Sequence, residues 1–189
     1  MIAELNTTDP KSKITIRDST DKDVPLVATL HANSWRSGYR NLLSERYLEK
    51  EIYRERLTVW QQRFSKASQK PMFVLVAEAN SMLVGFVCVF PDEDAVFGSL
   101  LDNLHVLPAL TGRGIGRMLL SDAAKRLVTN GSFGGLYLWV IQQNERARRF
   151  YENAGARVVG LRVNTMPDNT EVVALRCYWS SPETLVLKD

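Results

Sequence analysis

Hydrophobic and polar positions change their spacing along the chain, and each spacing predicts a type of element. Residues 13–17 alternate between polar and apolar side chains, as a half-buried strand does. Apolar residues then recur at helical spacing from about 24 to 39 and again from about 44 to 64. The first helix follows several N-cap candidates in residues 18–21 and has Pro25 in an early turn. The first third of the chain is therefore predicted to be a strand followed by two helices.

Strand-like runs dominate the rest of the chain, with two helices between them. Asn80-Ser81 is a two-residue hairpin signal, and residues 91–94 are predicted to form an acidic turn. The strands are expected at residues 72–79, 82–90, 100–106, 136–141, 157–163 and 171–179, and the helices at about 113–130 and 144–154. This order predicts an α/β (α+β) fold with a mixed, mostly antiparallel central sheet of about seven strands and helices on both faces. The crossover from residue 100 to residue 141 supplies its parallel pair.

Length and composition indicate a single globular domain. The 189 residues suit one domain at residues 13–180, with a flexible segment at 1–12 and a tail at 181–189. A formal net charge of +3 is too small to argue for nucleic acid. Cys88 and Cys177 lie in apolar runs and indicate small buried side chains rather than a disulfide framework. The absence of a signal-peptide core and of a long apolar run predicts a cytoplasmic protein with no membrane partner.

A glycine-rich segment between a strand and a helix is the first candidate site. Gly112, Gly114 and Gly116 leave backbone N–H groups uncovered, so that an anion can approach them closely. The helix that follows adds about half a positive charge at its N-terminus. Arg113 and Arg117 add two full charges. The segment therefore predicts a pyrophosphate cradle, with a simple tight turn as the alternative.

Two other phosphate-binding motifs are excluded at this segment by single residues. A Walker loop requires Gly-Lys-Ser/Thr, but here Gly116 is followed by Arg117 and Met118. A dinucleotide-binding loop requires a third glycine where Leu119 stands.

The second candidate site is the helix expected at residues 144–154. Asn144 is placed to cap its N-terminus, and Gly155 to close its C-terminus. Phe150 and Tyr151 are adjacent, so they lie about 100° apart around the helix. If Phe150 packs inward, the Tyr151 hydroxyl is free to face a neighbouring cleft. A core tyrosine with a solvated tip is the alternative.

Together, the two segments resemble the GNAT superfamily of acyl-CoA-dependent N-acyltransferases. That family has a strand ending in V-x-P, then R/Q-x-x-G-x-G/A opening a helix, a strand, and an N-x-x-A-x-x-F-Y-x-x-x-G-F helix. This chain has Val106-Leu-Pro108, Thr111-Gly-Arg-Gly-Ile-Gly116, and then Asn144, Ala147, Phe150, Tyr151 and Gly155. The order of elements agrees over residues 13–179.

The resemblance implies that acetyl-CoA is the co-substrate and that no metal is needed. Pantetheine would run along the fourth strand as a further strand, with one backbone N–H polarising the thioester. Asn144 would steady the pantetheine arm, and Tyr151 would protonate the leaving thiolate. The implied cofactor-binding residues are Leu104, His105, Val106, Thr111, Gly112, Arg113, Gly114, Ile115, Gly116, Arg117, Asn144 and Tyr151.

The chain departs from the family pattern at three positions. Thr111 replaces the usual Arg or Gln, which should weaken the site little because backbone amides bind the phosphates. Ala156 replaces a Phe, which indicates a packing change. Leu100 stands where many members have a glutamate base. The candidate replacements are His105, the acidic residues 92–94 acting through water, and Asp102, which strand alternation places on the face of Leu100, Leu104 and Val106.

The acceptor is expected to be a small-molecule or peptide amine, bound by the first two helices. His31, Trp35, Tyr39 and Tyr47 are the candidate lining residues, and an aromatic wall would suit a cationic amine. The alternative functions are a non-catalytic CoA-binding regulatory module, a nucleic-acid-binding domain suggested by four arginines, and O-acylation. We expect no nucleic-acid partner, and a homodimer is possible.

Overall fold

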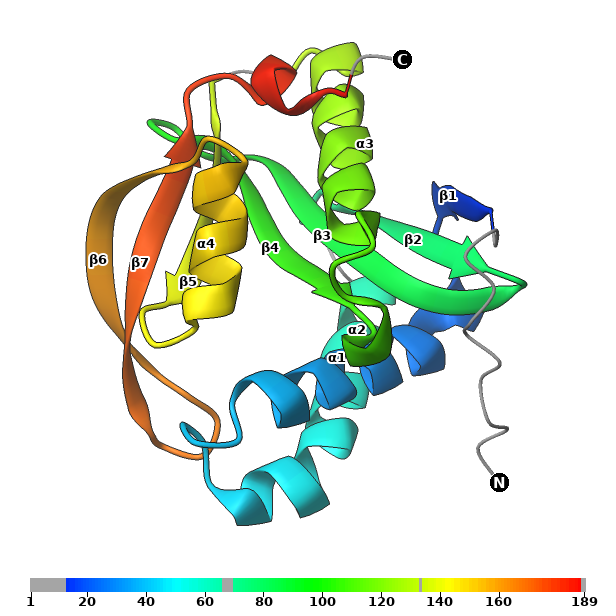
Figure 1. The fold of residues 1–189 in the computed structure, drawn as a ribbon, viewed down its shortest axis with the longest axis vertical. Helices are drawn as coiled ribbons and strands as arrows, with labels where there is room; N and C mark the ends of the chain where they lie inside the picture. Colours follow the sequence, from blue (N-terminus) through cyan, green and yellow to red (C-terminus); the bar gives the residue numbers. More distant parts are fainter. Residues whose placement is uncertain (1–12, 66–69, 133, 188–189) are drawn as a thin grey trace.

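The chain folds around one seven-stranded sheet (Figure 1). The structure is a computed structural model that describes residues 13–65, 70–132 and 134–187. The strands lie in the order β1-β2-β3-β4-β5-β7-β6, and every neighbouring pair is antiparallel except β4 and β5. Their bounds are β1 Ile14–Asp18, β2 Phe73–Ala79, β3 Met82–Asp94, β4 Gly98–Val106, β5 Leu136–Ile141, β6 Arg157–Thr165 and β7 Glu171–Trp179. The predicted fold class, including its parallel pair, is confirmed. The segment expected to be flexible, 1–12, lies outside the described residues.

Helices cover both faces of the sheet, because strands with apolar residues on both faces must be buried on both. On one face, α1 (Val24–Gly38) and α2 (Ile52–Phe64) pack against alternate residues of β2 and β3, such as Val76, Phe86 and Cys88. On the other face, α3 (Ile115–Thr129) and α4 (Glu145–Asn153) share a larger core with residues of β2 to β5 and β7. Figure 1 shows α3 and α4 side by side with β4 passing between them. Both cysteines are buried and free, as predicted.

Local structure departs from the predictions where the chain bends. The hairpin turn at Asn80 and Ser81 is confirmed, with φ of 49° and 62°, which matches the primed turns that twist with the strands. The prediction of an acidic turn at 91–94 is wrong, because β3 continues to Asp94, with an irregular register and a φ of 51° at Asp92. The stretch expected as one helix from 44 to 64 begins as a π-helical turn, Tyr47–Glu51, before α2.

The C-terminal segment that was expected to be a tail packs against α3. Residues Pro182–Leu185 form a 3-10 helix, and the Leu185 side chain is fully buried in the α3 core. The Leu187 N–H donates a 2.8 Å hydrogen bond to the Ser121 hydroxyl of α3. These contacts extend the packed structure beyond residue 180.

A bulge in β4 reorganises the strand at the centre of the fold. Cys88 of β3 pairs with Asn103, but Val89 pairs with Leu101, so Asp102 is an extra residue with no partner in the register. Leu104 and Val106 pack on the α3 side of the sheet, whereas Asp102 forms an ion pair with Arg63 of α2 on the opposite side. The alternation that placed Asp102 on the face of Leu104 and Val106 is therefore wrong, because the bulge inverts it.

Candidate active site

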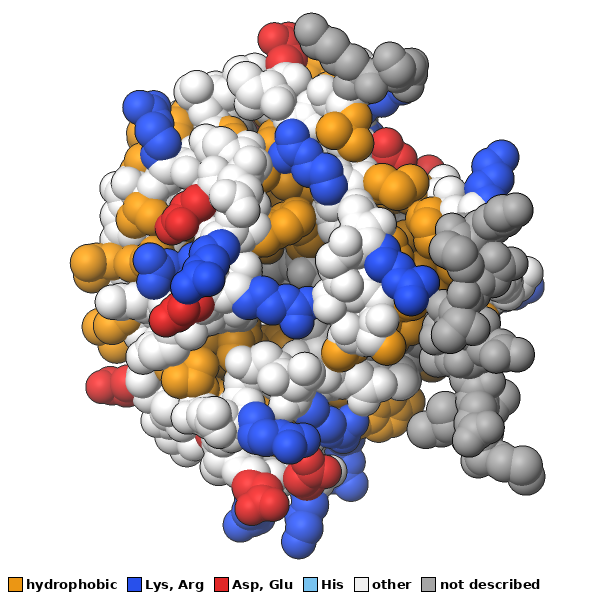
Figure 2. Space-filling model, viewed as in Figure 1, with side chains coloured by type: hydrophobic (Ala, Val, Ile, Leu, Met, Phe, Trp, Pro, Cys, Tyr) orange, Lys and Arg blue, Asp and Glu red, His pale blue; other side chains and the backbone are white. Residues whose placement is uncertain are grey.

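A cavity of about 720 Å³ opens where β4 and β5 separate, and residues from both faces of the sheet line it. We call the part lined by α3, α4 and the preceding loop the cofactor half. The part lined by α1, β5, β6 and the side chains of Glu93 and Asp102, from β3 and β4, is the acceptor half. Figure 2 shows the molecule hollowed between α3 and α4, with Lys and Arg side chains around the hollow.

The strands separate because their pairing stops after two positions. Ser99 pairs with Leu136 and Leu100 with Tyr137, and within these two fully described strands no later pair follows. The Leu107 N–H donates to Val84 of β3 (2.9 Å). N–H groups alternate in direction along a strand, so those of Leu104 and Val106 point to the open edge facing β5. This edge offers an extended molecule two unpaired backbone donors.

The glycine loop delivers the N-terminus of α3 to the cofactor half. Gly112 and Gly114 have φ of +82° and +80°, a conformation that glycine adopts without strain, and a Cβ at either would meet open space. Gly114 is the N-cap of α3 and no side chain caps the helix, so its first-turn N–H groups stay available. The Arg117 Nη1 atom is buried and has no hydrogen-bond partner among the described residues. These features fit a pyrophosphate.

The loop residues predicted from the motif line the cavity, apart from one. Arg113 is exposed and is not among the lining residues. Gly116 has a packing reason to be glycine, because a Cβ there would lie 3.4 Å from the Phe150 ring of α4. The cofactor-half residues that line the cavity from these predicted positions are Leu104, His105, Val106, Thr111, Gly112, Gly114, Ile115, Gly116, Arg117, Asn144 and Tyr151.

Helix α4 contributes the tyrosine predicted as the acid. The Asn144 side chain accepts from the Ala147 N–H (3.1 Å) and so caps the helix. One turn further on, Tyr151 is buried in an edge-to-face contact with Trp179 (6.0 Å between ring centroids). Burial, with Tyr39 and Cys177 nearby, raises the Tyr151 pKa above its ordinary value of 10.0. The hydroxyl therefore stays protonated at neutral pH and is able to donate.

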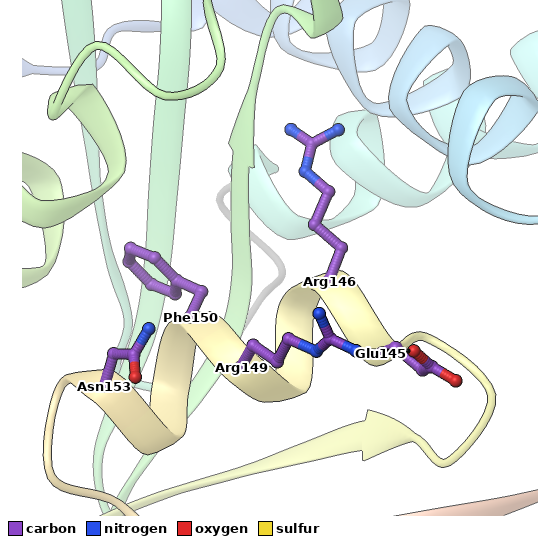
Figure 3. Close-up of a pocket in the computed structure, with 5 residues that line it drawn as sticks. All are labelled: Glu145, Arg146, Arg149, Phe150 and Asn153. Atoms are coloured by element: carbon purple, nitrogen blue, oxygen red, sulfur yellow. Dashed lines mark hydrogen bonds and ion pairs between the residues drawn. The ribbon is translucent and has the colours of Figure 1, made fainter.

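A second, shallower hollow of about 460 Å³ lies along α4 and adjoins the cofactor half. Figure 3 shows Arg146 and Phe150 on one side of the helix, with Glu145 and Arg149 along its front. Arg146 and Phe150 also line the main cavity, so the hollow extends its rim. Arg149 is held by Glu145 (3.1 Å). The sequence motif did not identify Arg146 as a cofactor-half cation, although its place two residues after the N-cap Asn144 was a usable signal.

Two of the candidate acceptor residues line the cavity and two do not. Trp35 and Tyr39 share a face of α1, with ring centroids 5.2 Å apart, and both line the acceptor half. Burial raises the Tyr39 pKa, which a side-chain hydrogen bond with Asn144 opposes. His31 is buried behind the wall, and Tyr47 is buried in a separate cluster with its hydroxyl 3.2 Å from Glu55.

The two histidines lie against each other at this wall. Their ring centroids are 4.5 Å apart, His31 Nδ1 accepts from the Trp60 indole N–H (3.1 Å), and His105 Nδ1 lies 2.8 Å from the Ser34 hydroxyl. Burial, reinforced by the positive charge of Arg56, lowers the pKa of His105 to about 3. Burial also lowers the His31 pKa well below its ordinary value. Both rings are therefore neutral at pH 7.

Asp102 lies at the cavity wall and is held by an arginine. Its carboxylate is 2.7 Å from Arg63, whose guanidinium also stacks on Trp60 (4.9 Å) and Phe90 (5.4 Å). The side chain of Asp102 also contacts the Asn103 amide. Among residues 92–94, Glu93 lines the cavity and is paired with Lys70.

Several lining residues of the acceptor half were not predicted from the sequence as acceptor-site residues. Ser34, Tyr137, Trp139 and Arg162 reach the cavity from α1, β5 and β6. Alternation along β5 groups Tyr137 with Trp139, but only the register of β5, β7 and β6 brings Arg162 over the Trp139 ring. Within the described residues, no group of three His, Cys, Asp or Glu side chains is placed to hold a metal ion. Helices in the same described ranges are all too short or too polar to cross a membrane.

Comparisons with known proteins agree with this geometry. The sequence model of the acetyltransferase (GNAT) family matches residues 34–156. The chain is 28% identical to the N-acetyltransferase YuaI of Bacillus subtilis over 86% of this chain and 88% of that protein. It is 27% identical to a probable N-acetyltransferase of Mycobacterium tuberculosis over 90% of this chain and 97% of that protein.

Solved structures share the fold. The PaiA N-acetyltransferase of Thermoplasma acidophilum, in complex with coenzyme A, superposes with a TM-score of 0.62 at 24% identity, covering 86% of this chain and 98% of that one. The spermidine N-acetyltransferase SpeG of Vibrio cholerae has a TM-score of 0.64 at 20% identity, covering 91% and 96%. The match over residues 34–156, which contains the glycine loop and α4, shows that this chain belongs to the acetyltransferase (GNAT) family of acyl-CoA-dependent enzymes.

Proposed function

We propose that this acetyltransferase transfers the acetyl group of acetyl-CoA to a primary amine by direct attack in a ternary complex. The observation that carries the proposal is the opening between β4 and β5, which joins the two halves in one cavity. Pantetheine is expected to extend along the free edge of β4, with the pyrophosphate at the N-terminus of α3. An amine in the acceptor half then meets the thioester without a covalent enzyme intermediate.

The free edge of β4 supplies the electrophilic group of this scheme. The N–H of Leu104 or Val106 donates to the thioester carbonyl and stabilises the charge that develops on its oxygen. By analogy with measured oxyanion holes, such a donor contributes about 2.7–4 kcal/mol. When the C–N bond has formed, the C–S bond breaks and the thiolate takes a proton from Tyr151. The products are the N-acetylated amine and the free thiol of CoA.

The amine must lose its proton before it attacks. An unperturbed lysine-type ammonium has a pKa of about 10.4, so its deprotonation at pH 7 costs roughly 4.6 kcal/mol. His105 is neutral but, with a pKa of about 3, is a weak acceptor at neutral pH. Asp102 lines the cavity as a carboxylate fixed by Arg63. We assign the general base to Asp102 ahead of His105 on geometry: the His105 Nδ1 atom is engaged by the Ser34 hydroxyl and its ring packs on His31, whereas the Asp102 carboxylate lines the cavity.

A CoA-binding regulatory module is the alternative, favoured by one observation: Leu100, which cannot take a proton, occupies the β4 position where the family resemblance implies a glutamate base. Measurement of thiol release from acetyl-CoA with a panel of amines and alcohols separates the two functions. Turnover with amines supports the proposal, and turnover with alcohols alone would replace it with O-acylation. Binding of CoA without any turnover would support the regulatory module.

Steady-state kinetics test the ternary complex. Double-reciprocal plots at several fixed acceptor concentrations should intersect, because both substrates must be bound before the acetyl group moves. Parallel lines, together with acetylated enzyme after incubation with acetyl-CoA alone, would instead indicate a covalent intermediate.

The homodimer that the sequence left open also stays a proposal. The edge strand β6 exposes Leu161 and Val163, which are 69% and 62% accessible, next to a half-exposed Val158. Exposed apolar side chains on an unpaired strand edge favour association. Sedimentation of the wild type and of a Leu161→Lys, Val163→Lys double variant tests this edge. A cytoplasmic location remains a prediction.

A further inference from the structure

The carboxylates that line the acceptor half form ion pairs, whereas the arginine that lines it does not form one with any described residue. Glu93 and Asp102 are its two carboxylates, and Lys70 and Arg63 neutralise them. Arg162 is the guanidinium that lines the same half. Across the described residues, it has no ion pair or hydrogen bond. The paired carboxylates weaken the case for a cationic acceptor, whereas Arg162 remains available to an anion.

Aromatic rings hold this guanidinium at the cavity. Arg162 stacks on the Trp139 ring at 4.0 Å from its centroid. Arg176 of β7 lies 4.6 Å from the same ring and 4.0 Å from Phe97. A guanidinium stacked by its flat face leaves its edge N–H groups free for the two oxygens of a carboxylate. The stacking therefore orients a bidentate donor.

The electrostatic surroundings also favour an anion. Burial, followed by repulsion from the Arg176 charge, lowers the Arg162 pKa, and the more weakly acting charges of Tyr137 and Asp102 oppose this shift. The nearest acids are engaged elsewhere: Asp102 with Arg63, and Asp94 with the N–H groups of Val96 and Phe97 (2.8 and 3.0 Å). A bound anion would relieve the repulsion between two guanidinium groups that share one aromatic ring.

We propose that the acceptor is an amino-carboxylate, an amine that carries a carboxylate received by Arg162, with Arg176 adding charge beside it. The proposal rests on the acetyltransferase function above and names its substrate class. The carboxylate at Arg162 would fix the molecule at the β5–β6 wall while its amine faces the thioester on β4. Polyamines lack the group that Arg162 binds and bring positive charge toward it.

Matched substrates test this class directly. With acetyl-CoA saturating, kcat/KM is measured for each proteinogenic amino acid and for its α-carboxamide, and for spermidine and phosphoethanolamine. The wild type should prefer at least one amino acid over its carboxamide by about 10–100-fold, the range expected for a hydrogen-bonded charge pair. Equal rates for every acid and carboxamide, or a preference for spermidine or phosphoethanolamine over every amino acid, would overturn the proposal.

Variants assign the preference to Arg162. Arg162→Gln should lower kcat/KM for the amino acid about 10–100-fold and leave the carboxamide unchanged, and Arg162→Lys should restore part of the loss. Arg157→Gln, on the same strand but outside the cavity lining, is the matched control and should behave as wild type. If Arg162→Gln lowers kcat/KM equally for the amino acid and its carboxamide, Arg162 only stabilises the sheet and does not bind the carboxylate.

A binding measurement separates this proposal from the proposed function. Quenching of tryptophan fluorescence is followed as the amino acid or its carboxamide is added to the CoA-loaded protein. Binding that requires the carboxylate and Arg162, but without turnover, would support this site and contradict the catalytic proposal. Turnover without carboxylate discrimination would do the reverse.

Discussion

The cofactor half and the acceptor half of the cavity are built in different ways. The cofactor half depends chiefly on backbone geometry: the positive φ angles of Gly112 and Gly114, the first turn of α3 and the open edge of β4. The acceptor half consists of side chains brought together from α1, β3, β4, β5 and β6. Backbone geometry depends on a few consecutive residues, so a short motif encodes it. Side chains from distant strands depend on the whole register of the sheet.

The largest expected effect is a loss of acetyl-CoA affinity when Gly114, in the cofactor half, is replaced. Gly114→Asp forces a side chain into the left-handed conformation and adds a negative charge to the pyrophosphate cradle. Acetyl-CoA affinity should fall at least about 100-fold, which corresponds to roughly 2.7 kcal/mol. Isothermal titration calorimetry with acetyl-CoA measures this, with and without a chelator, which should not affect wild-type binding.

Gly131 provides a matched control at the other end of the same helix. It also has a left-handed φ, +70°, and a Cβ there would also meet open space. Gly131→Asp therefore repeats the backbone strain and the charge away from the cradle, and should bind acetyl-CoA as the wild type does. Wild-type affinity in Gly114→Asp, or equal losses in both variants, would remove the cradle assignment.

The next largest effect concerns Tyr151, where the two halves meet. Tyr151→Phe removes one hydroxyl from a well-packed ring, so folding and acetyl-CoA binding should persist. Loss of the proton donor should lower kcat about 10²–10⁴-fold. Tyr47→Phe, which also alters a buried tyrosine but outside the cavity, is the control. A change in kcat of less than threefold would mean that water protonates the thiolate or that another step limits the rate.

The same contrast explains which parts of the fold the sequence predicted. Elements with strong periodicity, such as β2, β7 and α3, lie within two residues of their predicted bounds. The predicted turn at 91–94 failed because its charges are typical of a turn, whereas backbone pairing continues through Asp94. The bulge at Asp102 could not be predicted, because it arises where β4 has one residue more than the paired segment of β3, and neither strand shows this by itself.

The same contrast separates the site residues that the motif predicted from those that it missed. The motif placed the glycine loop, Asn144 and Tyr151 at the cavity, because each lies at a fixed offset within one strand–helix unit. It missed Ser34, Trp139 and Arg162, because their proximity arises from pairing between β5, β7 and β6 and from the packing of α1. The helical pattern at residues 24–39 made His31 a candidate lining residue, but its burial behind the wall depends on Trp60 and Phe86, which are far away in sequence.

A smaller effect on kcat/KM is expected when the two candidate bases, Asp102 and His105, are replaced in turn. Asp102→Asn should lower kcat/KM by about 10–100-fold, because the amide cannot take the proton of the amine. His105→Gln should have a weaker effect, because a ring with a pKa of about 3 accepts few protons at neutral pH. Profiles of kcat/KM recorded from pH 5 to 9 for both variants make the comparison. An unchanged profile in both would indicate a water-mediated base or an acceptor that arrives as the free amine.

The last expected effect is on stability, and it depends on pH. The chain has two histidines: His105 lines the cavity, and His31 packs against it behind the acceptor wall. Their pKa values are depressed in the folded protein, so below about pH 6.5 the unfolded chain binds protons that the folded protein does not. Stability should therefore be complete above pH 6.5 and fall with decreasing pH, by about 1.3 kcal/mol per histidine between pH 7 and pH 5.5.

Urea unfolding followed by tryptophan fluorescence at pH 7 and pH 5.5 measures this loss. Free carboxylates stay ionised over that range, so the histidines account for the change. In His31→Gln, whose amide oxygen is able to accept from the Trp60 indole as His31 does, about half of the pH-dependent loss should disappear. Equal free energies of unfolding at both pH values in the wild type would show that the rings take up protons inside the fold. The acceptor wall would then be wetter than its packing indicates, and His105 would regain its place as a base.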